Sequence, residues 1–207
     1  LITGQVGRPG TGLHPLRGQN NVQGASDAGL IPMFLPDYQP VGRDDMRGAF
    51  EKLWGQELDP QRGLTVVEIM NAIHAGEIHG MYVEGENPAM SDPDLQHARD
   101  ALAKLDHLVV QDLFVTETAF HADVILPASA FAEKSGSFTN TDRRVQLARE
   151  VIKPPGDARQ DLWIIQEIGK RMGLPWNYAG PGEVFTEMAQ LMPSLKNITL
   201  DRLVREG

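Results

Sequence analysis

The sequence predicts an α/β fold built around a parallel β-sheet, with helices on both faces in a three-layer αβα arrangement. Three short apolar runs, His79–Glu84, His107–Gln111 and Asp123–Leu126, are separated by segments with helical periodicity. Strands that alternate with helices favour right-handed crossovers and therefore a parallel sheet. The 21 glycines and 14 prolines among 207 residues also favour a loop-rich α/β protein over a helical bundle.

The first part of the chain differs from the rest. Residues 1–48 are punctuated by glycines without a clear period, and we expect the end of a helix followed by a long ordered loop. Regular structure is expected to begin near Leu64. Since a long loop inside a compact protein is often functional, we divide the chain into a glycine-rich loop region, residues 1–63, and an α/β domain, residues 64–207.

The helices between the strands have recognisable starts and ends. Thr65 and Glu68 form a T-x-x-E capping box at the start of the first helix, and Gly76 ends it. The turn GENPAMSDPD leads into a second helix with an apolar face over residues 95–105. A short helix, Thr116–His121, is expected before the third strand.

Two further helices are expected after the sheet. The first spans Asp161–Met172 and the second Glu183–Leu191. Helical spacing predicts that the inward face of the first is formed by Leu162, Ile165, Ile168 and Met172.

Polar residues follow the predicted strands at their carboxyl ends. A parallel sheet binds ligands in the crevice beyond these ends. Asn87 follows the first strand, and Gln111 and Asp112 end the second, so we expect all three along one rim. No GxGxxG motif follows any strand, so the standard dinucleotide fingerprint is absent.

Composition excludes several kinds of site. The net charge of −9 argues against a nucleic-acid partner, and the absence of cysteine excludes disulfides and thiolate metal sites. The six histidines lack a metal-binding spacing such as HExxH, so we predict no metal ligand. No apolar run approaches the roughly 20 residues of a membrane-spanning helix. The chain opens without Met or a secretory signal, and we expect an internal segment of a longer protein.

Five stretches in series carry a resemblance to a known family: LRGQNNVQGASDAG, GENP, VVQDLFVTETAFHADVILP, EKSGSFTNTDRRVQ and DLWIIQEIGKRMG. Together they resemble the large catalytic subunit of the molybdenum- or tungsten-dependent formate dehydrogenases, within the molybdopterin oxidoreductases of the dimethyl sulfoxide reductase type. The resemblance covers nearly the whole chain. It implies that residues 1–63 form part of an active-site wall and that residues 64–207 belong to a domain that binds a pterin dinucleotide.

The resemblance also implies cofactors and partners. Such enzymes bind two molybdopterin guanine dinucleotides that hold one Mo or W, and they oxidise formate to carbon dioxide. Electrons leave through a [4Fe-4S] cluster, which other parts of the parent must bind because this chain lacks cysteine. The metal's cysteine or selenocysteine ligand must also lie outside, so the chain alone is expected to be inactive. The HPLRGQNN and TNTDRRVQLARE stretches are most similar to the cytoplasmic type, which passes electrons to NAD through iron–sulfur and flavin subunits.

The RGQ loop is the expected substrate site. The family places an arginine and a glutamine near the metal, at positions matching Arg17 and Gln19. A guanidinium can bind formate through both oxygens and direct its C–H toward the metal. Nitrate-reducing relatives have a neutral residue in place of Arg17, which favours formate here. The alternative is that Arg17 only braces the loop. His14 is a candidate proton relay or a packed loop residue.

The expected dinucleotide site uses the strand ends. Asn87 would donate to a phosphate or the guanosine, or else form a plain Asn-Pro turn. Asp112 suits a ribose or guanine, because a carboxylate accepts from two donors. Gln111 stands where relatives have a small polar residue and would act mainly through its backbone. Lys134 matches a family position whose residue pairs with a phosphate. Asp161 matches an acid that contacts the base, although Asp161 is also a good helix N-cap.

The remaining candidates have equally strong structural interpretations. Thr116 and Thr118 would face the nucleotide or cap the short helix, and Asp123 would reach the guanine edge. A second set of polar residues is interpreted first as ordinary loop formers: Asn20, Asn21 and Gln23.

Two other functions remain open from the sequence. One is a non-catalytic, pterin-free relative such as the large iron–sulfur subunit of NADH dehydrogenase. The other is a generic nucleotide-binding α/β module without a redox role. Arg17 and the polar rim favour the formate dehydrogenase over both.

Overall fold

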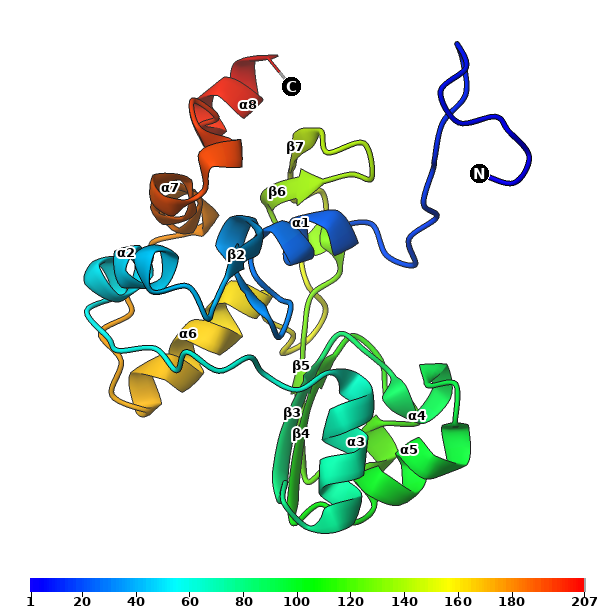
Figure 1. Cartoon of the computed structure of the whole chain (residues 1–207). Helices are drawn as coiled ribbons and strands as arrows, with labels where there is room; N and C mark the ends of the chain where they lie inside the picture. The colour runs from blue at the N-terminus through cyan, green and yellow to red at the C-terminus, as the bar shows by residue number, and fades with distance from the viewer. Residues whose placement is uncertain (207) are drawn as a thin grey trace.

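The computed structural model describes residues 1–206, and its centre is a three-stranded parallel sheet (Figure 1). The strands are β3 (Gly80–Glu84), β4 (His107–Asp112) and β5 (Val124–Pro127), and they lie in the order β3-β4-β5. Their register pairs Glu84 with Gln111 and Asp112 with Pro127. The predicted parallel sheet and α/β class are therefore confirmed.

One face of the sheet is covered by helices α3 (Val66–Ala75), α4 (Pro88–Ser91) and α5 (Leu95–Leu102) (Figure 1). Apolar residues of the strands and helices form two buried clusters there, which include Val83, Val110, Leu102, Met70 and Ile73. The alternation of side chains along a strand turns Tyr82 and Gln111 to the other face. Helix α6 (Asp161–Arg171) approaches that face at the carboxyl end of the sheet, since Gln111 bonds to Asp161.

The predicted capping box is confirmed. The Thr65 hydroxyl accepts from the Glu68 N–H, and the Glu68 carboxylate accepts from the Thr65 N–H at 2.8 Å. These bonds satisfy two of the amide groups that a helix leaves free at its start. Gly76 ends α3 with a φ of 74°, a left-handed conformation that glycine adopts without strain. The local sequence therefore determines both ends of this helix.

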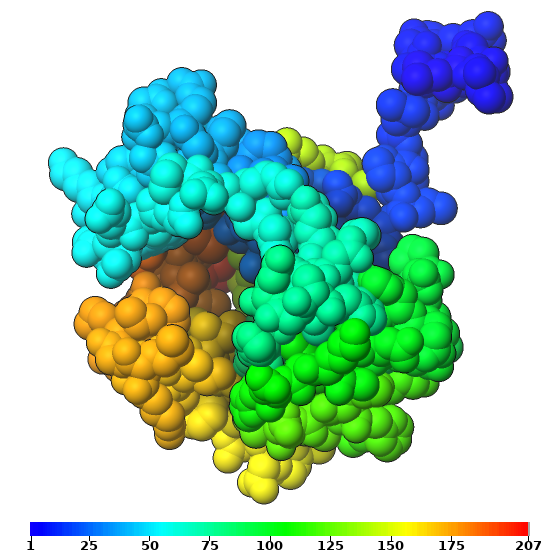
Figure 2. All heavy atoms as spheres, turned by 60° about the horizontal axis from the view of Figure 1, so that its bottom comes forward, coloured from blue at the N-terminus to red at the C-terminus, as the bar shows by residue number. Residues whose placement is uncertain are grey.

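Regular structure begins well before Leu64, so the expectation of a loop up to that residue is wrong. The chain forms α1 (Val22–Asp27), the short hairpin β1 (Phe34–Leu35) and β2 (Gln39–Pro40) around the 3-10 turn η1 (Pro36–Tyr38), and then α2 (Asp44–Trp54). Residues 1–20 are exposed throughout, and the first part of this segment extends away from the body of the molecule (Figures 1 and 2). The many glycines of this region predicted loops, so helices α1 and α2 were not expected.

These early elements pack against the end of the chain. A hairpin, β6 (Gly136–Thr139) and β7 (Val145–Ala148), contacts α1, while α7 (Pro181–Leu191), η4 (Pro193–Leu195) and α8 (Leu200–Glu206) enclose a third cluster. The Trp54 indole N–H donates to Glu187 Oε1 at 3.1 Å, which joins α2 to α7. Residues 21–54 therefore share a lobe with residues 136–206, beside the sheet (Figure 1).

The inward face predicted for α6 is wrong. Ile165 and Met172 are 36% and 76% exposed, and the buried residues are Ile164, Gln166 and Gly169. The cause lies in the segment that follows the helix. The Trp176 ring lies against Gly169, and the Gln166 side chain bonds to the backbone of residue 178.

The short segments 119–121 and 131–133 are single 3-10 turns, η2 (Ala119–His121) and η3 (Phe131–Glu133). The first lies inside the helix predicted for Thr116–His121, which is therefore shorter than expected. Within residues 1–206, no helix is both long and apolar enough to span a bilayer.

Candidate functional site at the carboxyl ends of the strands

Polar side chains gather at the carboxyl end of the parallel sheet. Because Glu84 pairs with Gln111 in the register, the ends of β3 and β4 bring these two residues side by side. The segment after β5 and the start of α6 add Lys134 and Asp161 to the same place. We call Tyr82, Glu84, Gln111, Lys134 and Asp161 the rim cluster.

Gln111 is the centre of the rim cluster, although its side chain is fully buried. Its Nε2 donates to Asp161 Oδ1 at 2.7 Å and to Glu84 Oε1 at 3.1 Å. The Tyr82 hydroxyl donates to Gln111 Oε1, so the side-chain amide is bonded at both ends. The side chain of Gln111 therefore organises the cluster, and a ligand contact through its backbone stays a prediction.

Lys134 and Asp161 form an ion pair in which each side chain is about three-quarters buried. Asp161 is the first residue of α6, and Gln160 at the N-cap makes no side-chain bond. A carboxylate in the first turn also interacts favourably with the helix dipole. The carboxylate of Asp161 therefore has partners from β4 and from the segment after β5, beyond the capping role considered for it.

Burial and neighbouring charge alter the acidity of two cluster members. Burial raises the pKa of the Glu84 carboxyl, and the nearby Asp161 carboxylate raises it further, while Lys134 opposes the change. Burial, with Glu84 and Asp161, raises the pKa of Tyr82 to about 12. Tyr82 therefore stays a neutral hydrogen-bond donor. Ionisation of Glu84 is disfavoured because it would place a second negative charge beside Asp161.

Asn87 lies on this side of the sheet but uses its side chain internally. Its Oδ1 accepts from the Thr118 hydroxyl at 2.7 Å and from the Thr118 N–H at 3.1 Å. Its Nδ2 donates to Glu117 at 2.7 Å. The Thr118 hydroxyl, fully buried, also accepts from the Ala89 N–H. Asn87 and Thr118 thus join the loop after β3 to the loop after β4.

The other candidates fall in different places. Asp112 accepts from the Leu113 N–H at 2.6 Å and ends β4 on the rim. Thr116 accepts from the N–H of Ala119, the first residue of the 3-10 turn η2, at 3.4 Å. Asp123 precedes β5, at the amino end of the sheet, where it accepts from the Leu108 N–H at 2.7 Å. The structure therefore does not bring Asp123 together with the rim cluster.

The opening loop reaches the rim through one residue. Gln19 Nε2 donates to Glu86 Oε1 at 2.8 Å, in the turn that follows β3. Arg17 and His14 are exposed, and their side chains make no hydrogen bond to other described residues. Asn21 Oδ1 accepts from the Thr139 N–H at 2.9 Å, and Gln23 is buried against Asp27. Both side chains are thus used inside the protein, although Gln23 lies within α1 and is not the loop former that we predicted.

Sequence reasoning missed three polar groups at this end of the sheet. Tyr82 and Glu84 lie within an apolar strand. Only the alternation of side chains between the two faces of the strand could have shown that both lie on the same face as Gln111. Ser129, two residues beyond β5, is 2% exposed, and its hydroxyl has no hydrogen-bond partner among the described residues. Such an unpaired buried hydroxyl is uncommon and is consistent with a polar ligand or a water molecule at this position.

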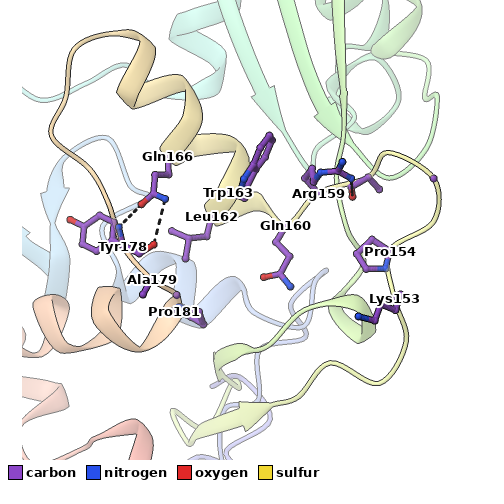
Figure 3. Close-up of a pocket in the computed structure, with 13 residues that line it drawn as sticks. Lys153, Pro154, Arg159, Gln160, Leu162, Trp163, Gln166, Tyr178, Ala179 and Pro181 are labelled. Atoms are coloured by element: carbon purple, nitrogen blue, oxygen red, sulfur yellow. Dashed lines mark hydrogen bonds between the residues drawn. The ribbon is translucent and has the colours of Figure 1, made fainter.

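Two cavities adjoin these elements. One, of about 410 Å³, lies beside the carboxyl end of β3 and is lined by residues that include Tyr82, Glu84, Glu86 and Pro88. The other, of about 460 Å³, lies between the start of α6 and residues 178–181 (Figure 3). Figure 2 shows a further hollow in the surface, between the segment that leads into α3 and the α6 region. No group of three or more His, Asp and Glu side chains within residues 1–206 is placed to hold a metal ion.

The rim offers both signs of charge to a ligand. The carboxylates of Asp112 and Asp161 can accept from amino, imino or hydroxyl groups, and the Lys134 ammonium can pair with a phosphate. Such a mixture suits a nucleotide, whose base and ribose donate and whose phosphates carry negative charge. The arrangement contains no nucleophile with an adjacent base and no metal ligands, so it is better suited to binding than to acid–base catalysis.

Comparison with known proteins gives a consistent result. The family described as molybdopterin oxidoreductase matches residues 1–171. A putative formate dehydrogenase of Bacillus subtilis is 48% identical over 93% of this chain and 20% of its own length. The alpha subunit of the F420-dependent formate dehydrogenase of Methanocaldococcus jannaschii is 47% identical over 100% of this chain and 31% of its own length. The chain thus spans about a fifth to a third of these relatives.

A solved structure supports the fold. Acetylene hydratase from Pelobacter acetylenicus matches 72% of this chain and 22% of its own, with a TM-score of 0.54 and 21% sequence identity. At this identity, the likeness concerns the fold alone.

Proposed function

Because the chain belongs to the molybdopterin oxidoreductase family, we propose that it is a segment of a molybdenum- or tungsten-dependent formate dehydrogenase, which oxidises formate to carbon dioxide. The relatives named as formate dehydrogenases cover nearly all of this chain at 46–48% identity. The observation that carries the proposal is the rim cluster at the carboxyl end of the sheet, together with the Gln19 contact that joins the RGQ loop to it.

The rim cluster, together with Asp112 at the end of β4, is our proposed half-site for one pterin guanine dinucleotide. Asp161 and Asp112 would accept from the guanine or ribose, and Lys134 would pair with a phosphate. Thr116 is retained as a peripheral contact, whereas Asp123 is left out because it lies at the opposite end of the sheet. The fit is supported by the unpaired Ser129 hydroxyl, which a polar ligand at this end of the sheet would satisfy. Asn87 and Gln111 would act by shaping the site rather than through free polar groups.

Arg17 is the proposed formate-binding residue. Its guanidinium is exposed and makes no side-chain hydrogen bond to other described residues, so it is free to bind a carboxylate. Formate has only two oxygens and one C–H, and a bidentate ion pair is the strongest contact it can make. Gln19 would position this loop through its bond to Glu86, and His14 would relay a proton. When bound, the metal and its pterins would supply the redox chemistry.

The remaining components belong to the proposal as well. The metal ligand and a [4Fe-4S] cluster would lie outside this cysteine-free chain. Electrons would pass through iron–sulfur and flavin subunits to NAD in the cytoplasm, although a relative named as F420-dependent uses a different acceptor. In this scheme, residues 1–63 form part of the active-site wall and residues 64–207 belong to the dinucleotide-binding domain.

Formate-dependent dye reduction by the full-length protein tests the proposal. We expect activity with formate in metal-loaded protein. Loaded protein that reduces no dye with formate would contradict a formate dehydrogenase, and protein that takes up neither pterin nor metal would favour a pterin-free relative.

Substitution of Arg17 tests the substrate site separately. Arg17→Ala is expected to raise KM for formate about 30-fold or more, because losing the partner of a bound charge costs roughly 2 kcal/mol or more. Arg17→Lys keeps the charge but not the paired geometry and should recover part of the affinity. Arg8→Ala, in the same exposed segment, is the control. An unchanged KM in Arg17→Ala would show that Arg17 only braces its loop.

A further inference from the structure

The cavity between α6 and residues 178–181 is separate from the rim cluster. Its volume is about 460 Å³, and none of Gln111, Lys134 and Asp161 lines it (Figure 3). This volume lies within the range of small-molecule sites in proteins, roughly 300 to 1,000 Å³. It is therefore large enough for a ligand of its own.

The charge of this cavity differs from that of the chain. The protein has 28 acidic and 19 basic residues, yet none of the 13 residues that line the cavity is acidic, and two are basic. Neither Lys153 nor Arg159 forms an ion pair with a carboxylate anywhere in residues 1–206. The Arg159 guanidinium donates to the neighbouring carbonyl of Ala158, at 3.0 Å, and to no carboxylate of the described residues. No lining carboxylate offsets these two positive charges, which favours an anionic ligand.

The walls of the cavity are held in place by specific contacts. Gln166 Oε1 accepts from the Tyr178 N–H at 2.5 Å, and Gln166 Nε2 donates to the Tyr178 carbonyl at 3.4 Å (Figure 3). These bonds fix the 178–181 segment against α6. The Trp163 ring lies on the wall and is 49% exposed, with the Arg159 guanidinium 5.8 Å from its centroid. This stacking limits the movement of Arg159 and leaves an aromatic surface free for a ligand.

The backbone adds donors to the same side. Helix α6 begins at the cavity, and its N-cap residue, Gln160, makes no side-chain bond. Free amide groups at a helix start supplement an anion site built by cations.

We propose that this cavity binds a phosphate monoester carrying a flat ring, of the size of a mononucleotide, at a site distinct from the rim cluster. Lys153 and Arg159 bind the phosphate dianion, because the two cations that line the cavity match its charge. The flat ring packs on Trp163 and the apolar residues beside it, since any aromatic base can stack on an indole ring. The remaining apolar lining, from Pro154 and Leu162, accounts for a preference over inorganic phosphate.

Calorimetric titration of the full-length protein with 5′-AMP, adenosine and inorganic phosphate tests this site. AMP should bind at least about tenfold more tightly than either partial ligand, because each lacks one of the two sets of contacts. Lys153→Met and Arg159→Met should each weaken AMP binding about fivefold, because a partly exposed ion pair contributes a free energy of this size. The affinity for AMP should then approach the affinity for adenosine. Trp163→Leu should weaken AMP but leave phosphate unchanged.

The control variants distinguish binding in this cavity from binding elsewhere on the protein. Lys196→Met removes an exposed lysine outside the cavity and should leave AMP binding unchanged. Asp112→Asn alters the rim and should also leave it unchanged, whether or not the protein binds a pterin dinucleotide. The proposal is overturned if AMP binds no better than adenosine, or if the Asp112 variant, rather than the cavity variants, loses AMP. It is also overturned if intact protein binds none of the three ligands, as expected when another segment of the parent fills the cavity.

Discussion

Gln111 and Asp161 lie 50 positions apart in the sequence, yet Gln111 Nε2 donates to Asp161 Oδ1 at 2.7 Å. This bond joins the carboxyl end of β4 to the first turn of α6, and it lies in the interior of the molecule because Gln111 is fully buried. The amide also contacts Tyr82 and Glu84 on the neighbouring strand. One side chain therefore links three elements that together form the rim.

Replacing Gln111 with Leu should destabilise the fold. The change removes three side-chain hydrogen bonds, to the Tyr82 hydroxyl and to one oxygen each of Glu84 and Asp161, and a hydrogen bond contributes roughly 0.5–1.5 kcal/mol net. Denaturant unfolding of the variant and the parent measures this difference. Gln96→Leu removes an exposed amide that bonds only to Asp100 and is the control. A Gln111 variant no less stable than the Gln96 variant would contradict a central role for this amide.

The Glu84 carboxyl should make stability depend on pH. Its pKa is raised above 4.5 by burial and by Asp161, so the folded state binds its proton more tightly than the unfolded state. The stability gained from that proton is present at pH values below 4.5 and is lost as pH rises through the raised pKa. Glu84→Gln keeps an acceptor for Gln111 but cannot ionise, so its advantage over the parent should grow from acid toward neutral pH.

Unfolding free energies of the Glu84→Gln variant at a series of pH values measure this effect. Glu77→Gln, at an exposed position without side-chain hydrogen bonds, is the matched control and should show no such trend. A stability difference that stays constant with pH, or shrinks toward neutral pH, would show that Glu84 ionises normally in the folded protein.

Gly169 is required by a close approach of an aromatic ring. A Cβ atom at this position would overlap Cε3 of Trp176, so Gly169→Ala must displace the ring. Overpacking of this kind costs about 1–3 kcal/mol. Gly48, inside α2, has open space around it, and Gly48→Ala should be neutral or stabilising by roughly 0.5–1 kcal/mol. Thermal unfolding of both variants compares the two sites, and equal effects would contradict the contact.

The local sequence predicted those parts of the fold that local interactions determine. The capping box of Thr65 and Glu68 places α3 correctly, because both partners lie within one helical turn. The carboxyl end of the sheet was predicted from strand order, and Gln111 with Asp112 does lie there. Strand order alone cannot show which residue of a later helix reaches that end, which is why the partnership of Gln111 with Asp161 was not anticipated.

The errors arise where distant contacts decide the structure. In α6, the apolar period pointed to Ile165 and Met172, but the chain that follows the helix packs on Gln166 and Gly169 instead. Helix α2 is stabilised by contacts such as Trp54 to Glu187, a residue more than one hundred positions away. The Asn87 side chain bonds to Glu117 and Thr118 in the next loop, and the sequence pattern around Asn87 does not reveal these partners.

The central claim is that the rim holds the guanine nucleotide of a pterin cofactor. Its most direct test is the molybdenum, tungsten and guanine nucleotide content of the full-length protein. This content is measured for the unsubstituted parent and for the Asp161→Asn variant. The account predicts stoichiometric metal with guanine nucleotide in the parent, and less of both in the variant, because the variant loses a charged acceptor. Full-length protein that contains neither metal nor guanine nucleotide, or an Asp161 variant with the same content as the parent, would contradict it.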